Sequence, residues 1–251
     1  PGLTTAQLAA WTPSVQIRAL ETAALAQLSS ARVKSLSSAQ LGYLSSAQLA
    51  ALSGAATGVL GTNTIASLNS ADLAALTSAQ VAGLSTAQLQ ALSSAQVPGL
   101  GTEDIAALSS VQIGALRTAS IAGLSTDQIA ALSSTNVKGL SSAQLLALSS
   151  SQIAALETDD FAQLSSAQLG ALSSKQGAGL TTAQLASLDS AELSKLSTAA
   201  VQGLSTAAIA GLSSTQVPGL TTAQLAAWTT SAQSRALESA DLAQLSSARV
   251  K

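Results

Sequence analysis

The nonapeptide LSSAQLAAL, residues Leu44 to Leu52, contains one complete copy of a motif that recurs along this 251-residue chain. If the last residue of each unit is counted as position 8, leucine occupies all 26 places in steps of eight from Leu20 to Leu220. We call each unit an octad. A repeat of this regularity predicts a solenoid-like array in which each unit is stabilised by its neighbours.

The other positions of the octad are conserved along the chain to different degrees. Among the 25 octads from Glu21 to Leu220, position 5 is a large aliphatic residue or Phe in 23, and position 2 is Ser or Thr in 24. Position 1 is Ser or Thr in 18, position 4 is Gln, Asn, Asp or Glu in 18, and position 7 is mostly Ala or Gly. We expect positions 5 and 8 to face a shared core, and positions 3 and 6 to point outward.

The period of eight excludes one long helix. At about 100° per residue, each octad would rotate the apolar pair by about 80°, so apolar residues would cover every face. A strand also fits poorly, because positions 5 and 8 would lie on opposite faces of the pleat. A short helix that restarts in every octad satisfies the spacing.

Each octad carries a helix-start signal. In the copy that follows Leu44, Ser45 can be the N-cap, Gln48 can complete a capping box, and Leu44 and Leu49 can form a hydrophobic staple. The hydroxyl is nevertheless more strictly kept at position 2, here Ser46, than at position 1. Either position 2 is the cap in many octads, or both hydroxyls satisfy backbone groups at the corner; the two alternatives stay open.

The helices must be very short and must stack. Pro98 and Pro218 stand at position 6, so helices there must end within about one turn. Such helices fall below the ~12 residues at which an isolated helix becomes marginally stable. We expect glycine at position 7 to leave the helix with positive φ, at Gly83, Gly99, Gly123, Gly139, Gly203, Gly211 and Gly219.

The expected fold is therefore an all-α solenoid or superhelix with one very short helix per octad; a β-solenoid is the alternative. We treat residues 1–251 as a single array. A longer period also exists, because residues 1–34 and 218–251 match at 29 of 34 positions. We interpret residues 1–217 as one higher-order repeat and 218–251 as the start of the next, within a longer array or a closed ring. The hand and the number of octads per coil are not readable.

Composition leaves little room for chemistry. The chain has no His and no Cys, and a formal net charge of −2 from ten basic and twelve acidic residues. We expect no enzymatic activity, no cofactor and no metal site, no nucleic-acid partner, and no insertion into a membrane, since polar residues interrupt every octad. The carboxylates are explained as residues at helix starts; they lie at Glu103, Asp104, Glu157, Asp159, Asp160, Asp189 and Glu192.

The few aromatic residues are candidate anchors for a partner. They are Trp11, Trp228, Tyr43 and Phe161. Each tryptophan is followed by a unit of nine residues instead of eight, so Trp can also fill the wider corner that the inserted residue makes. Thr-Thr pairs such as Thr4-Thr5 resemble ice-binding surfaces, which is a further and weaker alternative.

Two family resemblances follow from these residues. Ala71-Asp72-Leu73-Ala74 resembles the unit of pentapeptide-repeat proteins, but the period of eight excludes their β-helix. Units such as Leu84-Ser-Thr-Ala-Gln-Leu-Gln-Ala-Leu92 resemble the Leu/Ser/Ala/Gln octapeptide tracts of very long bacterial proteins described as adhesin-like or surface-associated. That resemblance implies an extracellular or cell-surface repeat segment, acting as a stalk, spacer or filament element. The alternative is an adhesin module that binds a protein or glycan.

Overall fold

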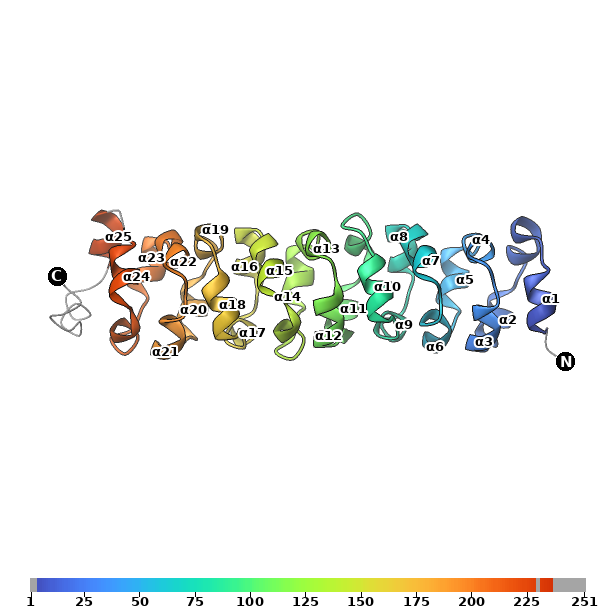
Figure 1. The fold of residues 1–251 in the computed structure, drawn as a ribbon, viewed down its shortest axis with the longest axis horizontal. Helices are drawn as coiled ribbons and strands as arrows, with labels where there is room; N and C mark the ends of the chain where they lie inside the picture. Colours follow the sequence, from blue (N-terminus) through green and yellow to red (C-terminus); the bar gives the residue numbers. More distant parts are fainter. Residues whose placement is uncertain (1–3, 229–230, 237–251) are drawn as a thin grey trace. The chain divides into compact units, whose positions relative to one another are not determined.

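The computed structural model describes residues 4–228 and 231–236, and within these ranges it contains short helices and no strand. Each octad contributes one helical segment of three to six residues, followed by an extended connection (Figure 1). The predicted all-α solenoid is confirmed, and the β-solenoid alternative is excluded for the described residues. The chain divides into two compact units, Pro1–Leu124 and Ser125–Lys251.

Unit 1 consists of α-helices with one π-helix and one 3₁₀ helix between them. The elements are α1 (Thr5–Ala9), the π-helix η1 (Pro13–Ile17), α2 (Thr22–Ala26), α3 (Ser30–Lys34), α4 (Ser38–Leu41), α5 (Ser46–Ala50), α6 (Gly54–Thr57), α7 (Thr62–Ser67), α8 (Ser70–Ala74), α9 (Ser78–Ala82), α10 (Thr86–Ala91), the 3₁₀ helix η2 (Val97–Gly99), α11 (Thr102–Ala107), α12 (Ser110–Ala115) and α13 (Thr118–Ala122).

Unit 2 repeats the same organisation. The elements are α14 (Thr126–Ala130), the 3₁₀ helix η3 (Val137–Gly139), α15 (Ser142–Ala147), α16 (Ser150–Ala155), α17 (Thr158–Phe161), α18 (Ser166–Ala171), α19 (Ser174–Gly177), α20 (Thr182–Ala186), α21 (Ser190–Leu193), α22 (Thr198–Gly203), α23 (Thr206–Ala210), the 3₁₀ helix η4 (Val217–Gly219), α24 (Thr222–Ala226) and α25 (Ser231–Arg235). Pro98 and Pro218 lie in η2 and η4, so the helical segments containing these prolines are single turns, as predicted.

The helix cap lies at position 1 of the octad. Ser45 precedes α5, and its hydroxyl accepts a hydrogen bond from the backbone N–H of Gln48 at 3.2 Å. The side-chain oxygen of Gln48 accepts one from the backbone N–H of Ser45 at 2.9 Å, which completes the capping box. Ser46 is the first residue of the helix. The structure therefore decides between the two alternatives: position 1 caps, and position 2 has another role.

The core is built from positions 5 and 8, as the sequence predicts. Leu49 and Leu52 are 1% and 3% exposed. The large aliphatic residues and Phe at these positions of the other octads from Glu21 to Leu220 are also buried, except for Leu28, which is half-buried. In two octads position 5 is not a large apolar residue: Thr57 and Gly177 stand there, and both are buried. Because each helix buries only two large side chains, most of its stabilisation comes from neighbouring coils.

Coils stack with a repeat of three to four octads. Within each unit, helices three elements apart pack together, as α7 does with α10 and α19 with α22. Hydrogen bonds between neighbouring coils join residues 28 and 31 positions apart, such as Gln80 to Leu52 and Leu49. A separation of 28 residues corresponds to three and a half octads per coil, a number that the octad alone does not contain.

The glycines at position 7 do not have the conformation that we expected. No described residue has positive φ, and Gly83, Gly123 and Gly211 have φ values of −77°, −83° and −83°. The helices instead end in right-handed geometry and continue into extended leucines. Glycine is needed for close packing: a Cβ on Gly99 or Gly203 would overlap the backbone of the position 2 residue 29 positions earlier. Position 2 therefore marks the contact between coils.

The residue inserted after Trp11 is absorbed by the π-helix η1, whose wider turn accommodates one extra residue. Gln40 spans this insertion and hydrogen-bonds the carbonyl oxygen of Trp11, 29 positions earlier, at 3.0 Å. In the next octad, Gln48 donates a hydrogen bond at 2.7 Å to the carbonyl oxygen of Leu20, which lies 28 positions earlier. The stacking register thus survives the insertion. Trp11 occupies the place of a position 8 leucine and is half-buried.

Candidate functional site

The most regular polar feature of the structure is a row of buried glutamines at position 4. The side-chain oxygen of Gln80 accepts a hydrogen bond from the N–H of Thr77 at 2.8 Å. Its Nε2 donates to the carbonyl oxygens of Leu49 at 2.9 Å and Leu52 at 2.6 Å, in the coil before. One side chain therefore caps its own helix and bonds two carbonyls at the end of another. The carbonyl of Leu49 also accepts the N–H of Leu52 at 3.1 Å, whereas that of Leu52 has no backbone donor among the described residues.

The same arrangement recurs in both units, and we call it the glutamine ladder. Residues with an Nε2 bond to the preceding coil include Gln40, Gln48, Gln80, Gln88, Gln96, Gln112, Gln168, Gln176, Gln184, Gln216 and Gln224. At position 4 of one octad, Ser120 replaces glutamine and donates its hydroxyl to the carbonyl of Leu92 at 2.8 Å. The donor is thus preserved by a shorter side chain.

The capping box was predictable from the sequence, whereas the hydrogen bond to the preceding coil was missed. The available signal is the preference for an amide: position 4 is Gln in 13 of the 25 octads and Glu in one. A capping box alone needs an acceptor, which Glu supplies as well as Gln. Only the amide adds a donor at the other end of the group.

The four candidate aromatic anchors lie in different environments. Phe161 is fully buried, and Trp228 is 8% exposed with its indole N–H donating to the carbonyl of Val201 at 3.2 Å. Trp11 is half-buried. Tyr43 is 39% exposed, and the guanidinium of Arg18 lies 5.2 Å from its ring centre. Trp11 and Tyr43 belong to unit 1, and Phe161 and Trp228 to unit 2. Tyr43 is the most exposed of the four.

Several of the acidic residues cap helices or complete capping boxes. Asp189 caps α21 by accepting from the N–H of Glu192 at 2.7 Å, and Glu192 completes the box at 2.9 Å. Thr181 and Thr221 of the Thr-Thr pairs are caps of the same kind. In the described part of the chain, no three acidic residues come together as a metal-binding group.

Asp160 differs from these carboxylates in its hydrogen bonding. It is buried at position 4, which is Gln in most octads, and its Oδ1 accepts a hydrogen bond from the hydroxyl of Ser134 at 2.8 Å. Its Oδ2 has no hydrogen-bond partner. Burial raises the pKa of Asp160; the bond from Ser134 opposes this rise, and the charges of Glu157 and Asp159 add to it.

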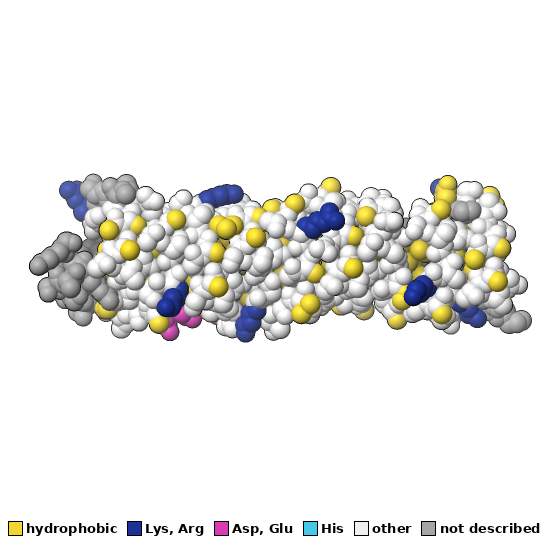
Figure 2. Space-filling model, viewed as in Figure 1, with side chains coloured by type: hydrophobic (Ala, Val, Ile, Leu, Met, Phe, Trp, Pro, Cys, Tyr) yellow, Lys and Arg dark blue, Asp and Glu magenta, His cyan; other side chains and the backbone are white. Residues whose placement is uncertain are grey.

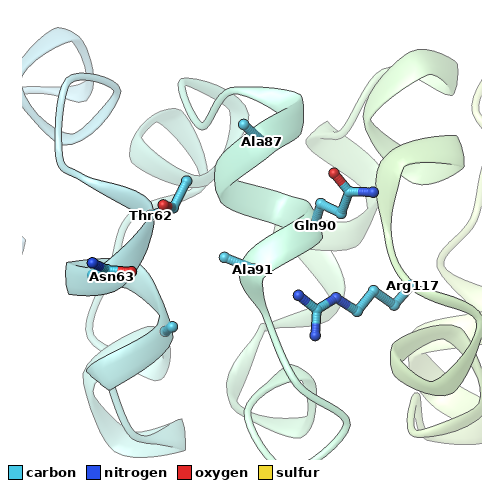
Figure 3. A pocket seen from close by; sticks show the side chains of 7 residues that line it. Thr62, Asn63, Ala87, Gln90, Ala91 and Arg117 are labelled. Atoms are coloured by element: carbon cyan, nitrogen blue, oxygen red, sulfur yellow. The ribbon is translucent and has the colours of Figure 1, made fainter.

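An open groove in unit 1 is lined by polar side chains from several coils. It measures ≈470 Å³ and is lined by Thr62, Asn63 and Ala66 of α7, by Ala87, Gln90 and Ala91 of α10, and by Arg117, which precedes α13. Figure 3 shows the Arg117 side chain extending from its own coil toward Ala91. The groove combines one cation, two amides and a floor of methyl groups.

Charges elsewhere on the surface are sparse. Figure 2 shows single, dispersed basic side chains on the visible face, among mostly uncharged atoms. Among the described residues, no helix has the length and apolar character needed to cross a membrane.

Comparisons with known proteins point to repeats. The model of the ALTTAQ repeat matches residues 17–54, 65–102, 97–134, 129–158, 153–190 and 185–222, which together span more than half of the chain. A search of curated proteins finds no match. Among solved structures, the chain is similar to the leucine-rich repeat-containing protein LegL7 from Legionella pneumophila, with 12% identity, coverage of 86% of this chain and 84% of LegL7, and a TM-score of 0.22.

Proposed function

We propose a structural role for this chain, which belongs to the ALTTAQ repeat family. In this proposal it is a non-enzymatic segment that acts as a stalk or spacer of a longer bacterial surface or secreted protein. The observation that carries the proposal is the glutamine ladder. Each ladder residue connects an octad to the coil before it and to nothing more distant, so the array can be lengthened without redesign. A spacer needs this property.

The composition of the surface supports the same role. Outward positions are mostly Ala, Ser and Thr, and the chain carries 22 charged residues in 251. A surface of small, uncharged side chains offers few strong anchors for other molecules, because hot spots at interfaces are enriched in Trp, Tyr and Arg. The absence of His and Cys from the sequence removes the commonest acid-base and thiol groups.

The spacer proposal is tested by lengthening the chain. Two coils of 28 residues equal seven octads, so duplication of residues 61–116 adds two whole coils. Small-angle X-ray scattering should then show a maximum dimension greater by about 16 to 20 Å, two helix-packing distances, with an unchanged cross-section. An unchanged maximum dimension, or the profile of an unfolded chain, would refute the proposal.

The surface location has its own test. Antibodies raised against this chain should label intact cells that produce the parent protein. Labelling that appears only after lysis would contradict the surface location and leave the spacer role intact.

Binding of a protein or glycan is the second candidate function. The exposed ring of Tyr43, with Arg18 beside it, favours this candidate. Replacing Tyr43 with Ala should leave the scattering profile unchanged in both cases, and it should weaken attachment to a surface only if the chain is an adhesin.

A further inference from the structure

The groove of unit 1 is made by departures from the repeat. Asn63 stands at position 3, which is Ala in 16 of the 25 octads, and Gln90 stands at position 6, which is Ala in 13. Arg117 is the single basic residue at position 1. The three residues follow one another at intervals of 27, close to one coil, and all three are exposed. Residues that depart from the repeat at three different octad positions therefore line the same groove.

Arg117 deprives its own helix, α13, of a side-chain cap. Position 1 is the cap, and α13 has no side-chain hydrogen bond at its cap because Arg117 replaces the usual Ser or Thr. The other residues that line the groove are uncharged, so no carboxylate there compensates the guanidinium. A residue that breaks a local rule of the repeat without a structural gain indicates a functional position.

The chemistry of the groove defines its ligand. A guanidinium offers a planar fork of donors that fits a carboxylate bidentately. The amides of Asn63 and Gln90 each offer a donor and an acceptor, which suits hydroxyl groups. Ala66, Ala87 and Ala91 give a shallow apolar floor. A volume of ≈470 Å³ lies in the range of small-ligand sites.

We propose that this groove binds an acidic saccharide, with a hexuronate carboxylate on Arg117 and sugar hydroxyls on Asn63 and Gln90. A single cation on a chain of net charge −2 does not suit a densely charged polyanion. A peptide is also a poorer fit, because the groove offers no strand edge for its backbone. The inference goes beyond the spacer role and does not depend on it.

The test uses the full chain and an NMR titration that follows the side-chain amides of Asn63 and Gln90. The probes are a hexuronic-acid trisaccharide and its neutral counterpart with reduced carboxyl groups. We expect saturable shifts of both amides with the acidic sugar. The neutral sugar should bind at least about tenfold more weakly, because the carboxylate contributes a charge-assisted bidentate pair.

Two variants separate binding from folding. Arg117→Ser restores the cap of the repeat, so it should raise the melting temperature while weakening binding of the acidic trisaccharide at least about tenfold. Gln202→Ala removes the other glutamine at position 6, outside the groove, and should leave binding unchanged. Equal binding by Arg117→Ser and the native chain would overturn the proposal. So would equal binding of the neutral sugar, unshifted amides, or equally tight binding of an acidic tripeptide.

Discussion

Gln80 donates a hydrogen bond from its side-chain Nε2 to the carbonyl oxygen of Leu52, 28 residues earlier, at 2.6 Å. The donor belongs to the start of one helix, and the acceptor follows the end of another in the adjacent coil. Local capping and long-range stacking thus depend on a single amide.

Replacing Gln80 with Ala should destabilise the chain by about 1 to 3 kcal/mol, because the carbonyl of Leu52 in the preceding coil loses its donor. Urea unfolding followed by circular dichroism measures the loss. Gln202→Ala is the matched control, since Gln202 is exposed at position 6, and it should be neutral. A Gln80 variant as stable as this control would show that the ladder is not a stabilising element.

Asp160→Asn should stabilise the chain at neutral pH. Because burial raises the folded-state pKa of Asp160 above its unfolded value, the protonated side chain favours folding at low pH, and this contribution is lost as the pH rises through the folded pKa. As the pH rises from the unfolded pKa of Asp160 through its folded pKa, the free energy of unfolding should therefore fall less steeply in the variant than in the native chain. Asp72→Asn is the control, since both oxygens of Asp72 accept hydrogen bonds, from Ser46 and Asn69; it should bring no gain.

Gly203→Ala should destabilise the chain by about 1 to 3 kcal/mol or more, because the new methyl group would overlap the backbone of Ser174 and force the coils apart. Gly42→Ala is the contrasting change. A Cβ there meets its nearest atom at 3.4 Å, and φ is −66°, so reduced freedom of the unfolded chain should give a slight gain of about 0.4 to 1 kcal/mol. Melting temperatures of the two variants should shift in opposite directions.

Ser85→Ala should cost about 1 kcal/mol, since the hydroxyl of Ser85 accepts the N–H of Gln88 at 3.3 Å and caps α10. Thr86→Ala, at the more strictly kept position 2, should cost less. The comparison tests the assignment of the cap to position 1. A larger loss for Thr86→Ala in chemical denaturation would reverse that assignment.

Features that depend on neighbours within one octad were predictable from the sequence. The cap at Ser45, the buried pair Leu49 and Leu52, and the short helix between them follow from residues at most eight apart. The glutamine ladder was not predictable, because its second half depends on stacking over 28 residues. The same reason explains the wrong prediction for glycine: at Gly203, the constraint comes from the backbone of another coil rather than from the chain leaving its own helix.

The candidate sites show the same division. In the sequence, Asp160 is one more carboxylate near the start of a helix. Only the packing of the coils shows that its Oδ2 is buried without a hydrogen-bond donor. Asn63, Gln90 and Arg117 are visible in the sequence as departures from the octad. Their meeting in one groove requires the length of the coil, which the octad does not encode.

The coil length of three and a half octads has a mechanical consequence. Each octad rests on the junction of two octads in the coil below, as bricks do in a wall whose vertical joints are staggered. The boundaries between octads are therefore not aligned along a unit. Two octads that separate in one coil are still bridged by an octad in the next coil. Opening one octad under tension must therefore break contacts in several others, which spreads an axial load over the whole circumference.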